Sequence, residues 1–174
     1  MCVLIYKPEG VEFVESDLQL ARDNNQDGVG CGWLVNGEFA WFKTQADALF
    51  GNIYSTTKEY PSIVHFRHAM SGDNSLNAVM PFRVWDYLFA HVGVLREFPS
   101  LESKSDSRQF VEEVLKKDDF DPFTDSGLLK IMNGYCSVTR NRMVFLRNDG
   151  VVRILGEKQG YWKHGCWYSG AILE

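Results

Sequence analysis

The chain has 174 residues, of which 45% are hydrophobic, 14% aromatic and 24% charged. This length is sufficient for one domain with a sizeable core, and the composition is that of an ordinary globular protein. The net charge of −5 and the pI of about 5.4 argue against a nucleic-acid-binding surface, which usually shows as an excess of basic residues. We therefore expect a single domain over residues 1–174 and no nucleic-acid partner.

Neither a membrane span nor a secretion signal is predicted. The longest apolar runs are far too short to cross a bilayer, and the N-terminus lacks a charged region followed by an apolar stretch and a cleavage site. The cysteines follow no disulfide framework spacing. They are Cys2, Cys31, Cys136 and Cys166. These features predict a cytoplasmic protein with free thiols and no membrane partner.

The first half of the chain predicts paired strands and two helices. Strands are expected at residues 2–6, 30–35, 39–42 and 62–67. Ser16 is expected to cap a helix that ends near residue 24. Asn36-Gly37 predicts a hairpin turn, because both residues tolerate positive φ. Thr44 is expected to begin a second helix that ends near Tyr54.

The second half predicts more strands and helices in groups. Strands are expected at residues 87–92, 143–146 and 151–155. Ser105 is expected to cap a helix through residue 116, and residues 126–132 form another that Gly134 ends. Asn148-Asp149-Gly150 predicts the turn of a second hairpin. Strands in hairpin pairs favour an α+β fold with antiparallel sheet over a βαβ alternation.

Cys2 is the candidate nucleophile. If Met1 is removed, Cys2 carries both a thiol and a free α-amine, which titrates near about pH 8 and can act as a general base for the thiol. A thiolate is a strong nucleophile towards an amide carbon. Most cysteines at position 2 have no special role. Here the apolar strand that follows would hold the amine rigidly, which favours the nucleophile hypothesis.

Three polar motifs could supply a binding site. Strand alternation puts His65 and Arg67 on the same side, where Arg67 can clamp a carboxylate with two hydrogen bonds or form a structural ion pair. An apolar strand then runs into Gly93, whose N–H can approach a ligand or belong to a plain turn. Asp106 stands at a helix start, where it can cap the helix or bind an ammonium group.

In this order the motifs resemble those of the class II glutamine amidotransferases, over residues 2 to about 115. The family begins Met-Cys, as this chain does. The other similar segments are the Asp-Gly-x-Gly motif within residues 25–30, the His-x-Arg-x-Ala-Thr/Ser-x-Gly motif at 65–72, the Asn-x-x-Pro-Phe motif near 77–82, the Ala-His-Asn-Gly-x-Leu motif at 90–95 and the Ser-Asp-Ser/Thr-Glu motif at 105–108. The Asp-Gly-x-Gly form is most similar to the small stand-alone members.

The resemblance implies a fold and a mechanism. The fold would be the four-layer αββα sandwich of N-terminal nucleophile hydrolases. Arg67, with His68 beside it, would bind the α-carboxylate of glutamine, and Asp106 would bind its α-amino group. Cys2 would attack the side-chain amide and release ammonia, the Gly93 N–H would hold the oxyanion, and water would hydrolyse the thioester. A γ-glutamyl-like amide is the alternative substrate.

The chain departs from the family at the oxyanion site. Val92 replaces the Asn whose side chain also holds the oxyanion, Arg108 replaces the Glu of the last motif, and Met70 thins the polar lining. Removing one oxyanion donor typically costs about 10²–10³ in rate. The enzyme could be slow, Asn74 or His68 could substitute as a donor, or the domain could be a glutamine-binding or regulatory module without activity. The enzyme is our principal hypothesis.

The sequence offers few alternatives to a site at Cys2. The remaining cysteines could be combined with His65 or His91 into a Cys-His-Asp hydrolase, but no local pattern supports this. The run from Gly28 to Gly32 precedes a strand, so it does not predict a dinucleotide loop. We expect no metal and no cofactor. The ammonia acceptor would lie on a separate synthetase or ligase subunit, or the chain would act as a stand-alone amidase.

Overall fold

The computed structural model describes residues 2–45, 50–69, 75–98, 104–117 and 120–170. Its strands are β1 (Val3–Lys7), β2 (Val29–Val35), β3 (Glu38–Thr44), β4 (Ser62–Phe66), β5 (Phe82–Val84), β6 (Tyr87–Val92), β7 (Arg142–Arg147), β8 (Val152–Leu155), β9 (Tyr161–Lys163) and β10 (Cys166–Tyr168). Its longer helices are α1 (Glu15–Asp23), α2 (Phe50–Thr57), α3 (Asp106–Phe110), which continues as a π-helix at Val111–Leu115, and α4 (Ser126–Thr139). Single 3-10 turns lie at Leu76–Ala78 and Glu157–Gln159.

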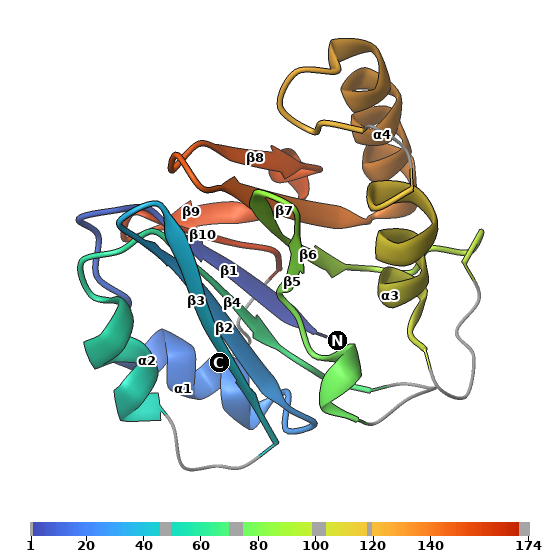
Figure 1. Ribbon diagram of the computed structural model, residues 1–174. Helices are drawn as coiled ribbons and strands as arrows, with labels where there is room; N and C mark the ends of the chain where they lie inside the picture. The colour runs from blue at the N-terminus through green and yellow to red at the C-terminus, as the bar shows by residue number, and fades with distance from the viewer. Residues whose placement is uncertain (1, 46–49, 70–74, 99–103, 118–119, 171–174) are drawn as a thin grey trace.

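The described strands form two antiparallel sheets (Figure 1). The first has six strands in the order β3-β2-β4-β1-β10-β9, and the second has four in the order β5-β6-β7-β8. β1 is thus an interior strand, paired with β4 on one side and β10 on the other. The α+β fold with antiparallel sheets, expected from the hairpin pattern, is confirmed.

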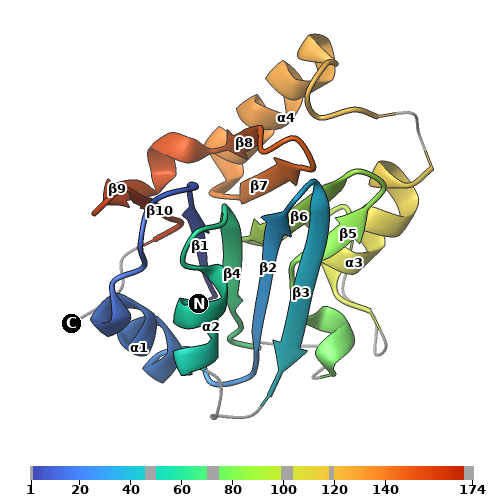
Figure 2. The same cartoon turned by 60° about the vertical axis from the view of Figure 1, so that its left-hand side comes forward.

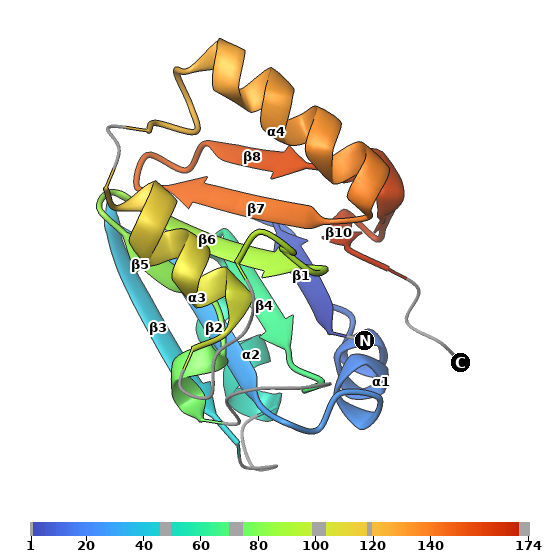
Figure 3. The same ribbon diagram turned by 90° about the vertical axis from the view of Figure 1, so that its right-hand side faces the viewer.

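Helices cover the outer face of each sheet. α1 and α2 lie together on one face of the six-stranded sheet (Figure 2), and α3 and α4 lie on the far face of the four-stranded sheet (Figure 3). One hydrophobic cluster fills the space between the sheets and continues under α3 and α4, and a second lies beneath α1 and α2. Each sheet therefore buries both of its faces, which explains why its central strands are nearly continuous hydrophobic runs.

The alternation of β4 decides which side chains face the second sheet. Ile63 belongs to the cluster between the sheets, whereas Val64 and Phe66 belong to the cluster beneath α1 and α2. His65 shares the side of Ile63, because successive side chains of a strand point to opposite faces. The hydrogen bond of His65 with Met80 agrees with this direction, and Arg67, one residue beyond the end of β4, is expected on the same side.

The glycines of β2 permit a close approach of the segment before β5. A Cβ on Gly30 would overlap the carbonyl oxygen of Met80, and one on Gly32 would lie 2.7 Å from the side chains of Leu88 and Pro81. Real Cβ atoms essentially never come this close to a heavy atom. The glycine pattern therefore serves packing between the sheets.

Two predicted helix starts are wrong. Thr44 is the last residue of β3, paired with Val29, as suits a β-branched side chain, and α2 begins at Phe50. Residues 46–49 of that predicted helix lie outside the described residues. α1 begins at Glu15 behind Val14, which makes no side-chain cap, so Ser16 lies inside the first turn. At Thr44, pairing in β3 outweighs the preference for a helix start.

One helix end is also wrong, while the turns are right. α4 continues past Gly134 to Thr139 and ends where Arg140 adopts the left-handed conformation with φ of 60°. Gly134 has open space around it, so the helix tolerates it. Asn36 and Gly37 have φ values of 51° and 79°, as the predicted hairpin requires.

Short elements complete the fold. β5, β9 and β10 have three residues each. The sequence did not predict them, because three residues are too few to show an alternating pattern. Within the described part of the chain, no helix is long and apolar enough to cross a membrane.

Candidate active site

Cys2 lies immediately before β1, beside the end of β4. The register pairs Val3 with Phe66, so the chain continues from Cys2 alongside Arg67 and His68. The backbone N–H of His68 donates to Cys2 Sγ at 3.3 Å, and the thiol lies 3.5 Å from the His68 carbonyl oxygen, to which it can donate. The sulfur is therefore held by both backbone polar groups of His68, which follows the end of β4.

Burial determines the state of this thiol. It raises the pKa of Cys2, while the hydrogen bond from the His68 backbone and the positive charge of Arg67 act in the opposite direction. The thiol is therefore mainly protonated at neutral pH, and a nucleophilic role requires a nearby base.

Two of the predicted motifs lie side by side next to Cys2. The N–H of Arg67 donates to Gly28 O at 2.8 Å, and the N–H of Asp27 donates to Arg67 O at 3.1 Å. Asp27 Oδ2 also accepts the N–H of Ala69 at 2.7 Å and lies 3.9 Å from His68 Nδ1. Asp27 thus fixes the chain that carries Arg67 and His68.

His65 contributes a neutral, fully buried ring to the same region. Its Nδ1 accepts the N–H of Met80 at 3.4 Å, and its Nε2 has no hydrogen-bond partner in the structure's described residues. Burial lowers the pKa of His65 to about 3, helped by the positive charge of Arg67. His65 therefore adds no positive charge beside Arg67 at neutral pH.

Gly93 lies at the other end of the predicted site, directly after β6. Its φ of 140° and the lack of a side chain are both required, because a Cβ there would overlap the side-chain amide of Asn141. Two residues on, the N–H of Leu95 donates to Asp106 Oδ2 at 2.8 Å. Asp106 Oδ1 accepts the N–H of Ser107 at 2.7 Å.

Asp106 therefore has the local role that its position at a helix start predicts. Ser105 is the N-cap of α3, and its Oγ accepts the N–H of Arg108 at 3.2 Å, as expected. Each oxygen of the Asp106 carboxylate accepts a backbone N–H. The hydroxyl of Ser107 also approaches Asp106 Oδ1, at 3.2 Å.

A buried side-chain network lies behind Gly93. His91 Nδ1 lies 2.8 Å from Ser107 Oγ, and His91 Nε2 lies 2.8 Å from Asn141 Oδ1. Asn141 Nδ2 donates to Val94 O at 3.0 Å and to Thr139 Oγ1 at 2.8 Å. The network joins β6, α3 and the loop between α4 and β7, and His91, Ser107 and Asn141 are all buried.

Val92 occupies an apolar position on the opposite side of β6. Leu88 approaches Gly32 of the first sheet, so alternation turns Ala90 and Val92 to that side as well. Val92 is 2% exposed and belongs to the hydrophobic cluster against which Cys2 packs. The position at which the sequence comparison expected a second oxyanion donor is thus filled by a buried apolar side chain. Asn74, one of the two possible substitute donors, lies outside the described residues, and so does Met70 of the predicted polar lining.

The described hydrogen bonds gather the predicted residues into two groups. Cys2, Arg67 and His68 form one at the start of β1, and Gly93 and Asp106 form the other at the end of β6. The hydrophobic cluster that contains Val92 connects them. Whether Arg67 and Asp106 face one ligand stays a prediction.

Four further polar residues support these groups and were not predicted as site residues. Asp27 and Ser107 lie inside matched motifs, so their hydrogen-bonding side chains could have been identified from the sequence as supporting residues. His91 lies in the matched motif at 90–95, where the sequence assigns it no role, and no motif contains Asn141. The last two are brought together by folding over 50 positions of sequence.

The other cysteines are structural. Cys31, Cys136 and Cys166 are buried and free, and burial raises the pKa of Cys31 above its usual range and those of Cys136 and Cys166 to about 11. Buried thiols of this kind are inert. Within the described ranges, no three His, Cys, Asp or Glu residues are grouped so that they could hold a metal ion.

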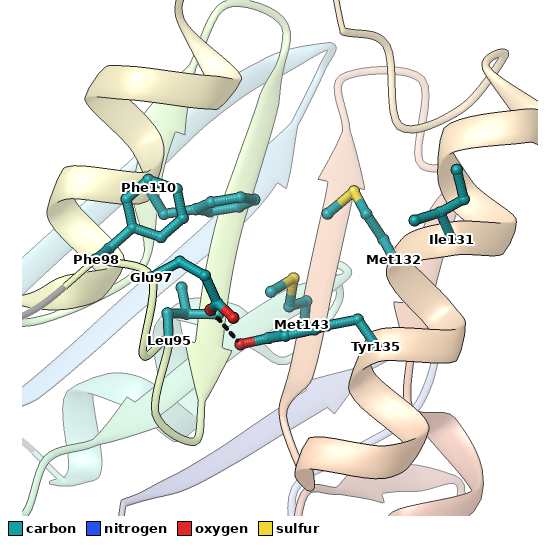
Figure 4. Close-up of a pocket in the computed structure, with 8 residues that line it drawn as sticks. All are labelled: Leu95, Glu97, Phe98, Phe110, Ile131, Met132, Tyr135 and Met143. Atoms are coloured by element: carbon teal, nitrogen blue, oxygen red, sulfur yellow. Dashed lines mark hydrogen bonds between the residues drawn. The ribbon is translucent and has the colours of Figure 1, made fainter.

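An apolar pocket of about 270 Å³ opens between α3 and α4 (Figure 4). Its described lining is Leu95, Glu97, Phe98, Phe110, Ile131, Met132, Tyr135 and Met143. Tyr135 donates a hydrogen bond to Glu97 at 2.7 Å. This lining includes none of the predicted site residues, so the pocket is separate from the Cys2 region.

The sequence matches no protein-family model and no curated protein. Among solved structures, glutamine phosphoribosylpyrophosphate amidotransferase from B. subtilis is similar with a TM-score of 0.54 and 14% identity, over 97% of this chain and 41% of that one. A glutamine aminotransferase class-II domain protein from Silicibacter pomeroyi has a TM-score of 0.45 and 12% identity, over 96% of this chain and 87% of that one. The chain thus spans less than half the length of the B. subtilis enzyme, and at this identity the likeness concerns the fold. In fold, the chain matches the class II glutamine amidotransferase domains.

Proposed function

We propose that this chain is a glutamine amidotransferase or glutaminase-type amide hydrolase that uses Cys2 as its nucleophile. The observation that carries the proposal is the position of Cys2 at the start of an interior strand. There its Sγ receives the His68 N–H at 3.3 Å, next to the buried guanidinium of Arg67. A nucleophile beside a fixed cation is what capture of an amino-acid carboxylate requires.

In the proposed mechanism, Arg67 and His68 bind the α-carboxylate of glutamine and Asp106 binds its α-ammonium. With Met1 removed, the α-amine of Cys2 takes the thiol proton, because burial keeps the thiol protonated. The sulfur attacks the amide carbon, and the N–H of Gly93 stabilises the negative oxygen.

The second half of the cycle regenerates the thiol. The carbon–nitrogen bond breaks, and the proton held by the amine goes to the leaving ammonia. Water then attacks the thioester, releasing glutamate and restoring the Cys2 thiol. We expect this chain to have the four-layer αββα arrangement typical of N-terminal nucleophile hydrolases. The ammonia acceptor would lie on a separate synthetase or ligase subunit, or the chain would act as a stand-alone amidase. A γ-glutamyl-like amide is the alternative substrate.

The test is intact-mass spectrometry with 6-diazo-5-oxo-norleucine, an electrophilic glutamine analogue. We expect loss of Met1 and one adduct on Cys2, and we expect excess glutamine to prevent the adduct. Cys2→Ala should show no adduct, and Cys136→Ala, which removes a buried thiol, should label as the wild type does. A trimmed wild-type protein without an adduct contradicts the proposal.

Val92 favours a second candidate, a glutamine-binding or regulatory module without activity. Its buried apolar side chain leaves Gly93 as the proposed source of oxyanion stabilisation, and loss of one donor costs about 10²–10³ in rate. Calorimetric binding of glutamine without ammonia release, under conditions where Met1 is absent, would favour the module over the enzyme.

A further inference from the structure

The turn that follows β6 is held from both sides at a single peptide group. The carbonyl oxygen of Val94 accepts Asn141 Nδ2 at 3.0 Å, and the N–H of Leu95 donates to Asp106 Oδ2 at 2.8 Å. These two groups belong to the same peptide plane, so its orientation is fixed. Gly93, one residue earlier, packs directly on the amide of Asn141.

The hydrogen bonds also define how each group of the network is oriented. Val94 O can only accept, so the amide nitrogen of Asn141 must be the atom that faces it. Thr139 Oγ1 donates to Tyr135 O at 2.7 Å and therefore accepts from the same amide nitrogen. Asn141 Oδ1 is consequently the atom that faces His91, and it can only accept.

The tautomer of His91 follows from that orientation. His91 Nε2 must carry a hydrogen to donate to Asn141 Oδ1. Burial lowers the pKa of His91 below its ordinary value, so the ring is neutral and Nδ1 is an acceptor. The single hydroxyl hydrogen of Ser107 then points to His91 Nδ1, leaving the 3.2 Å approach to Asp106 Oδ1 as a secondary one.

We propose that His91, Ser107 and Asn141 are positioning residues that orient the turn from Gly93 to Leu95, and with it the Gly93 N–H, for the reaction at Cys2. None of the three touches the reacting atoms in this scheme. They lie on the helix side of β6, as Phe89 does by its contact with Phe110, whereas Val92 faces the other side. The inference rests on the proposed function of Cys2.

The physical reason is preorganisation. Val92 offers no hydrogen bond, so stabilisation of the oxyanion depends on one backbone N–H. A donor contributes fully only if its direction is fixed before the reaction, and a misplacement of about 1 Å can cost around 10²-fold in rate. A dry, fully hydrogen-bonded network fixes a backbone more firmly than groups that exchange with water.

The test compares glutamine hydrolysis by the full chain and its variants. In Asn141→Ala we expect kcat to fall roughly 10- to 100-fold while KM for glutamine stays within about twofold. His91→Gln keeps an N–H near the Nε2 position and should retain more activity than His91→Leu. The control is Thr57→Ala, which removes a fully buried hydroxyl that donates to Ile53 O within α2, on the outer face of the six-stranded sheet, and its kcat should equal that of the wild type.

A second measurement does not depend on activity. Nitrogen-15 NMR should show the Nε2–H tautomer of His91 in the wild type, and Asn141→Ala should speed amide hydrogen exchange at Gly93 and Leu95 at least about tenfold. Ser107→Ala, a small change, serves if Asn141→Ala does not fold. Alkylation of Cys2 by iodoacetamide, which forms no oxyanion, should stay unchanged.

The outcomes separate the two proposals. An active wild type with an Asn141→Ala kcat within twofold overturns the positioning role. A wild type that never releases ammonia overturns the proposed function. In that case faster amide exchange at Gly93 and Leu95 in Asn141→Ala still supports the conclusion that Asn141 fixes the turn, and unchanged exchange overturns it.

Discussion

The two polar groups at the ends of β1 and β6 are built in opposite ways. Around Cys2, backbone amides hold the side chains, and two of the polar side chains reach solvent: those of His68 and Asp27 are 45% and 35% exposed. Behind Gly93, side chains hold the backbone, and His91 and Asn141 are 2% and 0% exposed. The difference indicates that His68 and Asp27 can exchange water for a ligand, whereas the buried His91 and Asn141 can only fix the geometry of the backbone beside them.

The largest expected effect lies in the exposed group. Cys2→Ala should lower glutamine hydrolysis on the order of 10⁶-fold, the scale seen when a nucleophile is removed. It should leave the thermal midpoint almost unchanged, because Cys2 is only partly buried. Ammonia release and thermal denaturation measure the two quantities. Activity that survives in Cys2→Ala would move the reaction away from the start of β1.

Val92→Asn tests whether the apolar residue between the two groups limits the rate. The new amide would restore the donor that the family carries, so kcat should rise roughly 10²-fold. Burying the amide should lower the free energy of unfolding by about 1–3 kcal/mol. Steady-state kinetics and urea denaturation report both. Val92→Ala makes room without a donor and should not raise kcat, and an equal rise in both variants would contradict the donor argument.

Gly93→Ala tests the buried network behind Gly93 through the free energy of unfolding. The added Cβ would overlap Asn141 and force a non-glycine residue to a φ of 140°, so the free energy of unfolding should fall by about 3 kcal/mol or more. The matched control is Gly134→Ala in α4, where space is open and a gain of about 0.5–1 kcal/mol is expected. Urea denaturation distinguishes them. Equal effects at both glycines would show that the turn is not held as described.

The smallest effect concerns pH and His65. Its pKa of about 3 in the folded chain lies below the unfolded value of about 6.5. The unfolded chain therefore binds more protons between these values, and stability present above pH 6.5 is lost as the pH falls. At pH 5 the loss from His65 is about 2 kcal/mol. His65→Gln should flatten this part of the curve, measured by urea denaturation from pH 8 to 4.5, and parallel curves there would contradict the assignment.

The fold was predictable where short-range patterns are strong. Asn36-Gly37 predicted its hairpin because few other residues adopt those φ values, and Ser105 predicted the start of α3. Thr44 was misleading as a helix start because its β-branched side chain also suits a strand, and it pairs with Val29. Gly134 was misleading as a helix end because the low helix propensity of one glycine is outweighed by its context. β5, β9 and β10 escaped because three residues carry no period.

The candidate site was only partly predictable for the same reason. Cys2, Arg67, Gly93 and Asp106 stand in motifs that can be read along the chain. Asn141 stands in none, and its importance depends on the distance of 2.8 Å to His91. A contact between residues 50 positions apart leaves no local pattern.

The sequence by itself determined the residue types that the chemistry needs, the hairpins and the α+β class, because these follow from local backbone preferences and from alternation. Only the tertiary structure decided which of those residues meet. It put Asp27 against the strand end that carries Arg67, turned Val92 into the core, and placed His91 and Asn141 behind Gly93. Such contacts arise from the packing of two sheets and their covering helices, and packing depends on all the side chains at once.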